Sequence, residues 1–192
     1  VESPVPYGVP RGAIVDLAPV VDGHPARDRV VFADFIPNNW SAWPNTYQKV
    51  DVVKHGPQQV VVRATRDWGK VTIATTYTLR AGAARIELQT VMTNGGDTPL
   101  ANLLSGLTLW PSAGYYFGIP GLGDLQEGPS TGALANRAVA YDEDWSITLH
   151  APYLNFVGSR SKDLFLQHTL QPGESRTFDA WLQVGARGDL SP

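Results

Sequence analysis

The residue types that most often carry out chemistry are scattered in this 192-residue sequence. Its four histidines are His24, His55, His150 and His168, and no two of them lie two or four residues apart. A metal site needs three or four ligands that converge from separate strands, and acid–base catalysis needs a proton donor and an acceptor around the substrate. Because the spacing favours neither, we expect structural histidines, no metal site and no cofactor.

Carboxylates cluster once, at Asp142, Glu143 and Asp144. Hard oxygen ligands suit Ca²⁺, but the glycine and the spaced ligands of an EF-hand loop are missing, so we favour a solvated hairpin tip. The sequence also has no nucleophile elbow of the Gly-x-Ser-x-Gly type and no phosphate-binding Gly-x-x-x-x-Gly-Lys loop. A Ser-His-Asp triad stays open, because its members need not be neighbours in sequence.

The best candidate binding site is the segment 37–47, with the sequence Pro-Asn-Asn-Trp-Ser-Ala-Trp-Pro-Asn-Thr-Tyr. A flat indole can stack on the C–H face of a sugar ring, and an asparagine amide both donates to and accepts from hydroxyl groups. Two tyrosines of another loop would line the same surface. The predicted ligand-binding residues are Asn38, Asn39, Trp40, Trp43, Asn45, Tyr47, Tyr115 and Tyr116. Two alternatives remain open: the aromatic side chains cap one end of the fold, or they anchor an interface.

Composition excludes several classes of protein. The net charge is −3 and there is no run of lysine or arginine, so we expect no binding to nucleic acid. No apolar run approaches the roughly 20 residues that span a bilayer, and we expect no membrane contact. Cysteine is absent, which excludes disulfides. The chain starts at Val1, and we take it to be processed or cut from a longer protein. Six tryptophans and seven tyrosines in a Gly-, Asn- and Thr-rich background are typical of secreted or periplasmic carbohydrate-handling modules.

A period of two residues predicts long strands at residues 70–79 and 86–93. β-branched residues predict another strand at residues 60–66, and a mainly apolar run predicts a strand buried on both faces at residues 101–110. Three of the strands have one apolar row, which should face a core. These inward rows are Val71, Ile73, Thr75, Tyr77 and Leu79; Ile86, Leu88, Thr90 and Met92; and, in the closing strand 176–184, Phe178, Ala180, Leu182 and Val184. The rows that face the other way include Arg85, Glu87 and Gln89, and Asp179, Trp181 and Gln183.

Shorter strands are expected elsewhere, and no convincing amphipathic helix is present. They lie at residues 12–18, 29–36, 50–54, 138–141, 145–150, 155–157 and 164–170. Asp-Gly at residues 22–23 and Pro-Gly at residues 172–173 predict turns, and residues 119–134 are expected to be irregular. The sequence therefore predicts an all-β protein, an antiparallel β-sandwich, with an extended arm at residues 1–11, a single domain at residues 12–185 and a tail at residues 186–192.

Two segments resemble the galactose-mutarotase-like supersandwich family. Residues 93–100, Thr-Asn-Gly-Gly-Asp-Thr-Pro-Leu, are similar to that family's turn after a long central strand. Residues 170–175, Leu-Gln-Pro-Gly-Glu-Ser, with Trp181 beyond them, are similar to its last turn and closing strand. The resemblance covers roughly residues 58–110 and 164–184 and implies a supersandwich-like fold.

The resemblance does not extend to the family's catalytic groups. Catalytic members use a histidine as general acid shortly after the first turn and a glutamate as general base on the strand before the Pro-Gly turn. Here residues 106–111, Gly-Leu-Thr-Leu-Trp-Pro, hold no histidine, and residues 164–168, Leu-Phe-Leu-Gln-His, hold no carboxylate. The resemblance therefore implies the fold and argues against epimerase activity.

These observations favour a non-catalytic accessory domain of a larger secreted or periplasmic protein. Its partner would be carbohydrate, or a neighbouring domain of the parent chain. A second hypothesis is a small carbohydrate-active enzyme, a lyase, epimerase or hydrolase, whose site would draw on His150, His168, Asp34 or Glu127. A third is a structural assembly domain. Whether the chain is an enzyme stays open, with a non-catalytic role favoured.

Overall fold

Antiparallel strands form the regular structure of the computed structural model. It describes residues 12–14, 17–18, 20–25, 30–39, 49–111, 116–119, 123–126, 136–141, 144–151 and 162–186. These residues contain no helix, so the all-β prediction is confirmed. Within them no helical segment has the length and apolarity that crossing a membrane requires.

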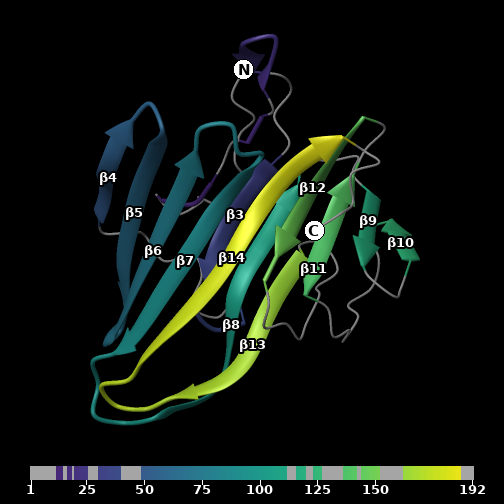
Figure 1. Ribbon diagram of the computed structural model, residues 1–192. Coiled ribbons are helices and arrows are strands. Elements are labelled where there is room, and N and C mark those ends of the chain that lie inside the picture. Colours follow the sequence, from purple (N-terminus) through teal and green to yellow (C-terminus); the bar gives the residue numbers. More distant parts are fainter. Residues whose placement is uncertain are drawn as a thin grey trace.

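The strands are numbered in chain order (Figure 1). They are β1 (Val20–Val21), β2 (His24–Pro25), β3 (Val30–Ile36), β4 (Lys49–Gly56), β5 (Gln59–Trp68), β6 (Val71–Arg80), β7 (Arg85–Asn94), β8 (Leu100–Pro111), β9 (Tyr116–Ile119), β10 (Gly123–Gln126), β11 (Arg137–Tyr141), β12 (Trp145–His150), β13 (Lys162–Leu170) and β14 (Ser175–Ala186).

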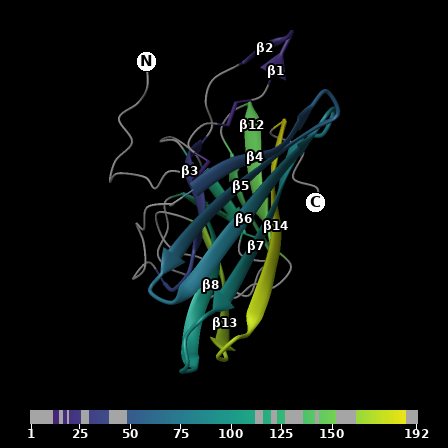
Figure 2. The same cartoon turned by 90° about the vertical axis from the view of Figure 1, so that its left-hand side faces the viewer.

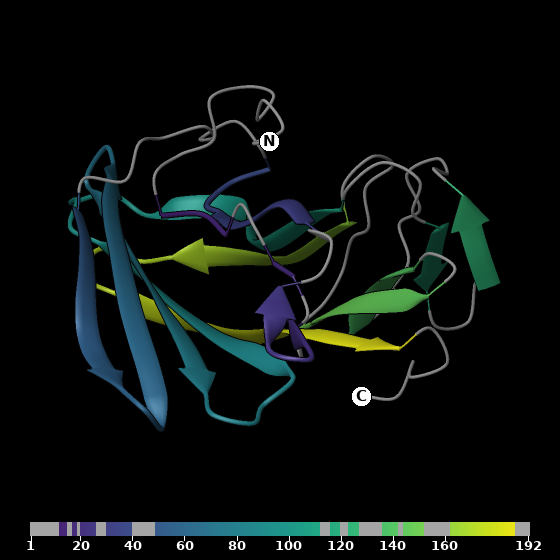
Figure 3. The ribbon, with the colours of Figure 1, turned by 90° about the horizontal axis from the view of Figure 1, so that it is seen from above.

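Two sheets make up the sandwich. The large sheet has nine strands in the order β10-β9-β11-β12-β14-β7-β6-β5-β4, and the small sheet has three in the order β13-β8-β3. Seen from above, β3, β8 and β13 form a layer on one side of β7 and β14 (Figure 3). Turned to the side, β4, β5, β6 and β7 follow one another across the face of the large sheet (Figure 2). The antiparallel sandwich predicted from the sequence is confirmed.

β5, β6 and β7 pair in succession in the large sheet, but the fourth long strand predicted from the sequence does not continue this meander. β8 pairs with β3 and β13 of the small sheet rather than with β7. The chain crosses over at a turn in which Gly96 N donates to Asn94 Oδ1 (2.9 Å), as the Asn-Gly-Gly sequence predicts. The Nδ2 group of Asn94 also donates to Leu170 O (3.2 Å) at the end of β13. One buried asparagine thus fixes two of the connections between the sheets, β7 to β8 and β13 to β14.

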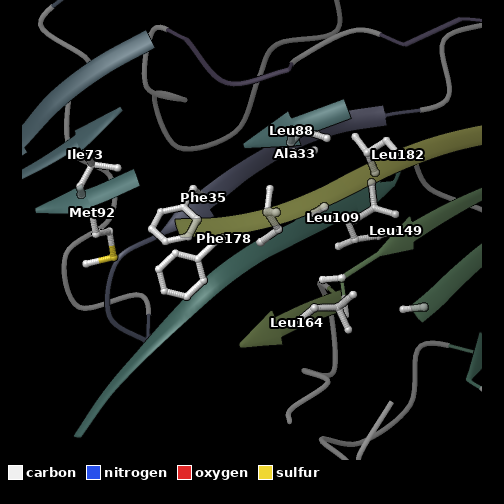
Figure 4. Close-up of a cluster of buried hydrophobic side chains, with 14 of the residues drawn as sticks. Ala33, Phe35, Ile73, Leu88, Met92, Leu109, Leu149, Leu164, Phe178 and Leu182 are labelled. Carbon is white, nitrogen blue, oxygen red and sulfur yellow. The ribbon is translucent and has the colours of Figure 1, made fainter. Parts of the chain in front are cut away.

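The core lies between the two sheets, because β6, β7, β11, β12 and β14 of the large sheet turn apolar side chains toward the small one. Phe35 of β3 and Phe178 of β14 meet across this interface, with ring centroids 5.0 Å apart (Figure 4). Thr75 and Thr90 are opposite each other on β6 and β7 and satisfy one another through a hydrogen bond of 2.9 Å. The inward rows predicted for β6, β7 and β14 therefore reach the core, apart from Leu79, which is 46% exposed.

The structure differs from the sequence-based prediction at three places. Residues 12–18 were expected to form a strand, but the described residues among them form only an isolated bridge between Ile14 and Ala33. Residues 119–134 were expected to be irregular, yet they include β10, which pairs with β9. β4 continues through Gly56, because its backbone pairs with β5 up to Gln59. Short strands at sheet edges depend on pairing that the local sequence does not encode.

Other predictions on the connections are confirmed. Asp22 and Gly23 both have positive φ (49° and 78°), as a two-residue hairpin turn between β1 and β2 requires. Gly173 has a φ of 72° in the turn before β14. The expected strand at residues 155–157 and the expected arm at residues 1–11 lie outside the described residues.

β8 and β13 approach so closely at Gly106 that no side chain fits there. A Cβ atom on Gly106 would lie 2.0 Å from Leu164 O, a contact that real Cβ atoms do not make. Both strands contribute side chains to the apolar core, so neither can move aside to make room for a Cβ atom.

We expect Gly106→Ala to destabilise the protein by about 3 kcal/mol, at the upper end of the range for adding a methyl group to a packed interior. Gly56→Ala is the matched control, because its Cβ would have 4.0 Å to the nearest atom. Urea denaturation measures both variants. Equal stability of the two would contradict the close approach of β8 and β13.

Candidate functional site

The structure describes part of the predicted loop site. Asn38 and Asn39 follow β3, and Tyr116 begins β9, where it pairs with Tyr141 of β11. The other predicted ligand-binding residues lie outside the described residues, and these are Trp40, Trp43, Asn45, Tyr47 and Tyr115. Stacking of a sugar on this loop therefore stays a prediction.

The chain after β3 is tied to β8 by three hydrogen bonds. Leu104 N donates to Asn38 Oδ1 (3.2 Å), Asn39 N donates to Leu104 O (2.9 Å), and Ser105 Oγ donates to Pro37 O (2.6 Å). Asn39 adopts a positive φ of 37°, which asparagine tolerates better than most residues. These contacts fix the start of the aromatic segment on the small sheet.

His168 lies in the interior between the sheets. Its Nε2 atom is 2.7 Å from Ser105 Oγ, and its ring meets the edge of Phe178. Because the Ser105 hydroxyl gives its proton to Pro37 O, His168 Nε2 must be the donor toward Ser105. Burial lowers the pKa of His168, and the charge of Arg176 lowers it further. A donor nitrogen cannot take the serine proton, so this Ser-His pair serves the fold and does not activate a nucleophile.

Two buried carboxylates lie on the face of the small sheet that points away from the core. Asp34 of β3 and Asp163 of β13 are the register partners of Thr108 on β8, which donates to Asp163 Oδ1 (2.6 Å). Arg66 reaches over from β5 of the large sheet, donates to Phe35 O and pairs with Asp34 Oδ2 (3.6 Å). Both side chains of this ion pair are fully buried, so each charge depends on the other.

The groups named for an enzyme do not meet. His150 is on the outer face of the large sheet, His168 is between the sheets, and Asp34 is on the outer face of the small sheet. Glu127 lies outside the described residues. A general acid and a general base must both reach one substrate, and these three groups of the described chain cannot do so. Among the residues that the structure describes, no three metal-binding side chains form a group.

The outer face of the large sheet carries a different polar array, one that sequence reasoning did not single out. Backbone register aligns one residue from each of five neighbouring strands in a row across this face. From β11 to β6 the row is Arg137, His150, Trp181, Glu87 and Thr78. The sequence places Trp181 and Glu87 on outward rows of their strands, but only the strand order makes them neighbours.

Trp181 is the centre of this row. His150 stacks on its indole, with centroids 4.9 Å apart and planes inclined by 14°, and the guanidinium of Arg85 lies 5.7 Å from the ring centroid. Trp181 Nε1 and His150 Nε2 are buried and have no hydrogen-bond partner among the described residues. Most buried polar groups have a hydrogen-bond partner, so two adjacent nitrogens without one make this place a candidate binding site.

A groove of about 430 Å³ lies beside Trp181, over β6, β7 and β14. Thr76, Thr78, Arg85, Glu87, Leu88, Gln89, Asp179, Ala180 and Trp181 line it. Gln89 Nε2 donates to Asp179 Oδ1 (2.9 Å), and Arg80 and Arg85 both reach Glu87 (3.3 and 3.2 Å). Donors and acceptors thus stand next to an aromatic ring on a rigid sheet.

His150 is 4% exposed and close to two cations. Burial is the largest cause that lowers its pKa, and the charges of Arg137 and Arg85 lower it further. His150 is therefore neutral at pH 7, and one of its ring nitrogens is a donor while the other is an acceptor.

The fold is that of galactose mutarotase-like proteins. A galactose mutarotase-like protein from Lactobacillus casei matches with a TM-score of 0.52 at 14% identity, over 83% of this chain and 90% of that one. A galactose mutarotase related enzyme from Lactobacillus acidophilus matches with a TM-score of 0.50 at 9% identity, over 85% and 89% of the two chains. At such low identity the likeness shows the fold alone.

The same fold occurs as part of a longer enzyme. The GH36 α-galactosidase AgaA from Geobacillus stearothermophilus matches with a TM-score of 0.51 at 13% identity, over 87% of this chain. This chain spans 29% of that α-galactosidase. No protein-family model matches the sequence, and no curated protein matches it.

The two buried histidines predict how stability depends on pH. Their lowered pKa values mean that the unfolded chain binds protons more readily than the native state does. The free energy of unfolding should therefore fall as the pH drops below about 6.5, by at most about 1.4 kcal/mol per pH unit for each histidine. Urea denaturation between about pH 7.5 and about pH 5 measures this slope. His150→Gln should reduce the slope, and a slope unchanged in that variant would contradict the assignment.

Proposed function

We propose that this chain is a non-catalytic carbohydrate-binding domain of a larger secreted or periplasmic protein. The observation that carries the proposal is the groove beside Trp181 on the outer face of the large sheet. The mutarotase-like fold supports the substrate class, because its structural neighbours include a galactose mutarotase-like protein and an α-galactosidase.

The groove has the chemistry that a sugar requires. A sugar ring presents hydroxyl groups that donate and accept hydrogen bonds, and C–H groups that pack on apolar surface. Thr76 and Thr78 supply hydroxyls, and Gln89 supplies an amide that its bond to Asp179 holds in place. The indole of Trp181 forms an aromatic wall. Because these side chains stand on three paired strands, little ordering is needed when a ligand binds.

The aromatic segment 37–47 is a second surface for the same role. Asn38 and Asn39 fix its start on β8, and Trp40, Trp43, Asn45 and Tyr47 supply its aromatic rings and amides. Tyr115 and Tyr116 belong to this proposed surface as well.

Trp181→Ala is expected to weaken retention on a polysaccharide by about tenfold or more, equivalent to about 1.4 kcal/mol, because the variant removes the aromatic wall. Affinity electrophoresis of the variants across a panel of polysaccharides measures the effect. Thr72→Ala is the matched control, since Thr72 is exposed on the same face of β6 but outside the groove.

Trp40→Ala and Trp43→Ala locate the binding surface. If they abolish retention with little change in melting temperature while Trp181→Ala has no effect, the saccharide binds to the loop and the groove assignment is wrong. If none of the three variants changes retention, the carbohydrate-binding proposal fails.

A second candidate function is that of an assembly domain, and an exposed apolar area favours it. The apolar shelf is the core-side surface of β4, β5 and β6 beyond the small sheet, formed by Val50, Val52, Val60, Val62 and Leu79. Val52 is 65% exposed and Leu79 is 46% exposed. Contiguous apolar surface of this kind marks contacts with other polypeptides.

The assembly role predicts that the protein self-associates through this shelf. Sedimentation velocity should show association that increases with protein concentration, and Val52→Lys or Leu79→Lys should abolish it, because a buried unpaired ammonium group is costly. Thr72→Lys, on the opposite face of the large sheet, should leave association unchanged. A protein that stays monomeric at all concentrations would contradict this role.

A further inference from the structure

The outer face around Trp181 holds more hydrogen-bond donors than acceptors. Within the described residues the side chain of Arg137 has no hydrogen bond or ion pair, and Trp181 Nε1 is a donor without a partner there. Arg85 has five N–H groups, and one of them donates a hydrogen bond to Glu87. A buried donor without a partner is unfavourable, and a ligand oxygen would supply the missing hydrogen bond.

Positively charged side chains also outnumber carboxylates on this face. Arg80 and Arg85 share the single carboxylate of Glu87, and Arg63 donates to Thr76 Oγ1 (3.4 Å) at the edge of the groove. The other carboxylate of the groove, Asp179, accepts from Gln89. Asp51 of β4 is in register with Arg63 and pairs with Lys49. With these two residues counted, four basic side chains face three carboxylates, and Arg137 adds a fifth cation beyond His150, although the whole chain has a net charge of −3.

We infer that this face recognises acidic saccharides, with Arg85 and Arg137 on either side of the Trp181–His150 stack binding the carboxylates of uronic acid units. The inference rests on the proposed carbohydrate-binding function and names its ligand class. A guanidinium matches a carboxylate with two parallel N–H···O bonds, which a neutral hydroxyl cannot accept in the same way.

The geometry suits a chain of several sugar units better than a small anion. Arg137 and Glu87 are three strands apart in one row, about 14 Å at the spacing of neighbouring strands. The groove continues from there across β7 to Thr76 and Thr78 of β6. Arg85 is half-exposed, so its side chain is free to leave the indole and follow a ligand.

Affinity electrophoresis with two forms of one polymer tests the inference. The probes are polygalacturonate and its fully methyl-esterified form, which has the same backbone without charge. We expect the wild-type protein to bind the acidic form at least tenfold more tightly. Arg85→Gln and Arg137→Gln should each weaken binding to polygalacturonate by about tenfold, the loss expected for a hydrogen bond to a charged group.

Lys49→Gln is the matched control, because it removes the same charge from the far edge strand β4 of the same sheet. It should change the affinity for polygalacturonate by less than about twofold. If Lys49→Gln weakens binding as much as Arg85→Gln does, or if dextran sulfate competes as well as polygalacturonate, the protein senses charge alone and the inference is wrong.

The remaining outcomes separate this inference from the proposed function. If both forms bind equally and neither arginine variant changes the affinity, the acidic specificity is wrong while carbohydrate binding stands. If neither form binds but a neutral polysaccharide is retained through Trp181, the ligand class is again wrong. If the wild-type protein retains no polysaccharide at all, the proposed function and this inference both fail.

Discussion

Burial of the small sheet against one face of the large sheet is the contact on which the rest of the structure depends. Alternation along each strand turns every second side chain toward that contact, and these side chains form the apolar core. Phe35, Phe178 and Leu164 meet there (Figure 4). The side chains on the opposite face of β6, β7 and β14 take no part in this packing. The polar array around Trp181 is possible only because the other face of the same strands stabilises the fold.

Polar side chains inside the sandwich form hydrogen bonds and an ion pair that link its strands. Arg66 joins the large sheet to β3, the Ser105 and His168 pair joins β8, β13 and the chain after β3, and Asn94 joins the crossover to the end of β13. Each buried donor or charge needs its partner, because an unpaired one costs several kcal/mol. His168 and Asp34, two residues on which an enzyme site would have drawn, belong to these structural contacts.

The sequence predicts the long strands well and the site poorly. Period-two alternation identifies β6, β7 and β14 and their inward rows, because half-buried strands carry that signal locally. It does not show that β14 lies between β7 and β12, since strand order depends on contacts distant in sequence. For that reason Glu87, Trp181 and His150 appear in the sequence as unrelated residues of three strands. The small strands β1, β2, β9 and β10 carry too few residues for a periodic signal.

The predicted loop site and the array on the outer face rest on different kinds of evidence. The loop stands out by composition, with three aromatic residues, three asparagines and two prolines in the segment 37–47. The array stands out by geometry, with a stacked His150 and Trp181, two unpartnered nitrogens and a groove beside them. Composition shows which residues are suited to a sugar, whereas geometry shows which residues act on one ligand together.

The central claim is that ligand recognition takes place on the outer face of the large sheet. Titration of the ¹⁵N-labelled protein with a galacturonate oligosaccharide, followed by two-dimensional NMR, tests it most directly. We expect shifts to concentrate on amides of β6, β7, β14 and β12 and on the indole N–H of Trp181. Shifts confined to the segment 37–47, or no shifts at saturating oligosaccharide, would contradict it.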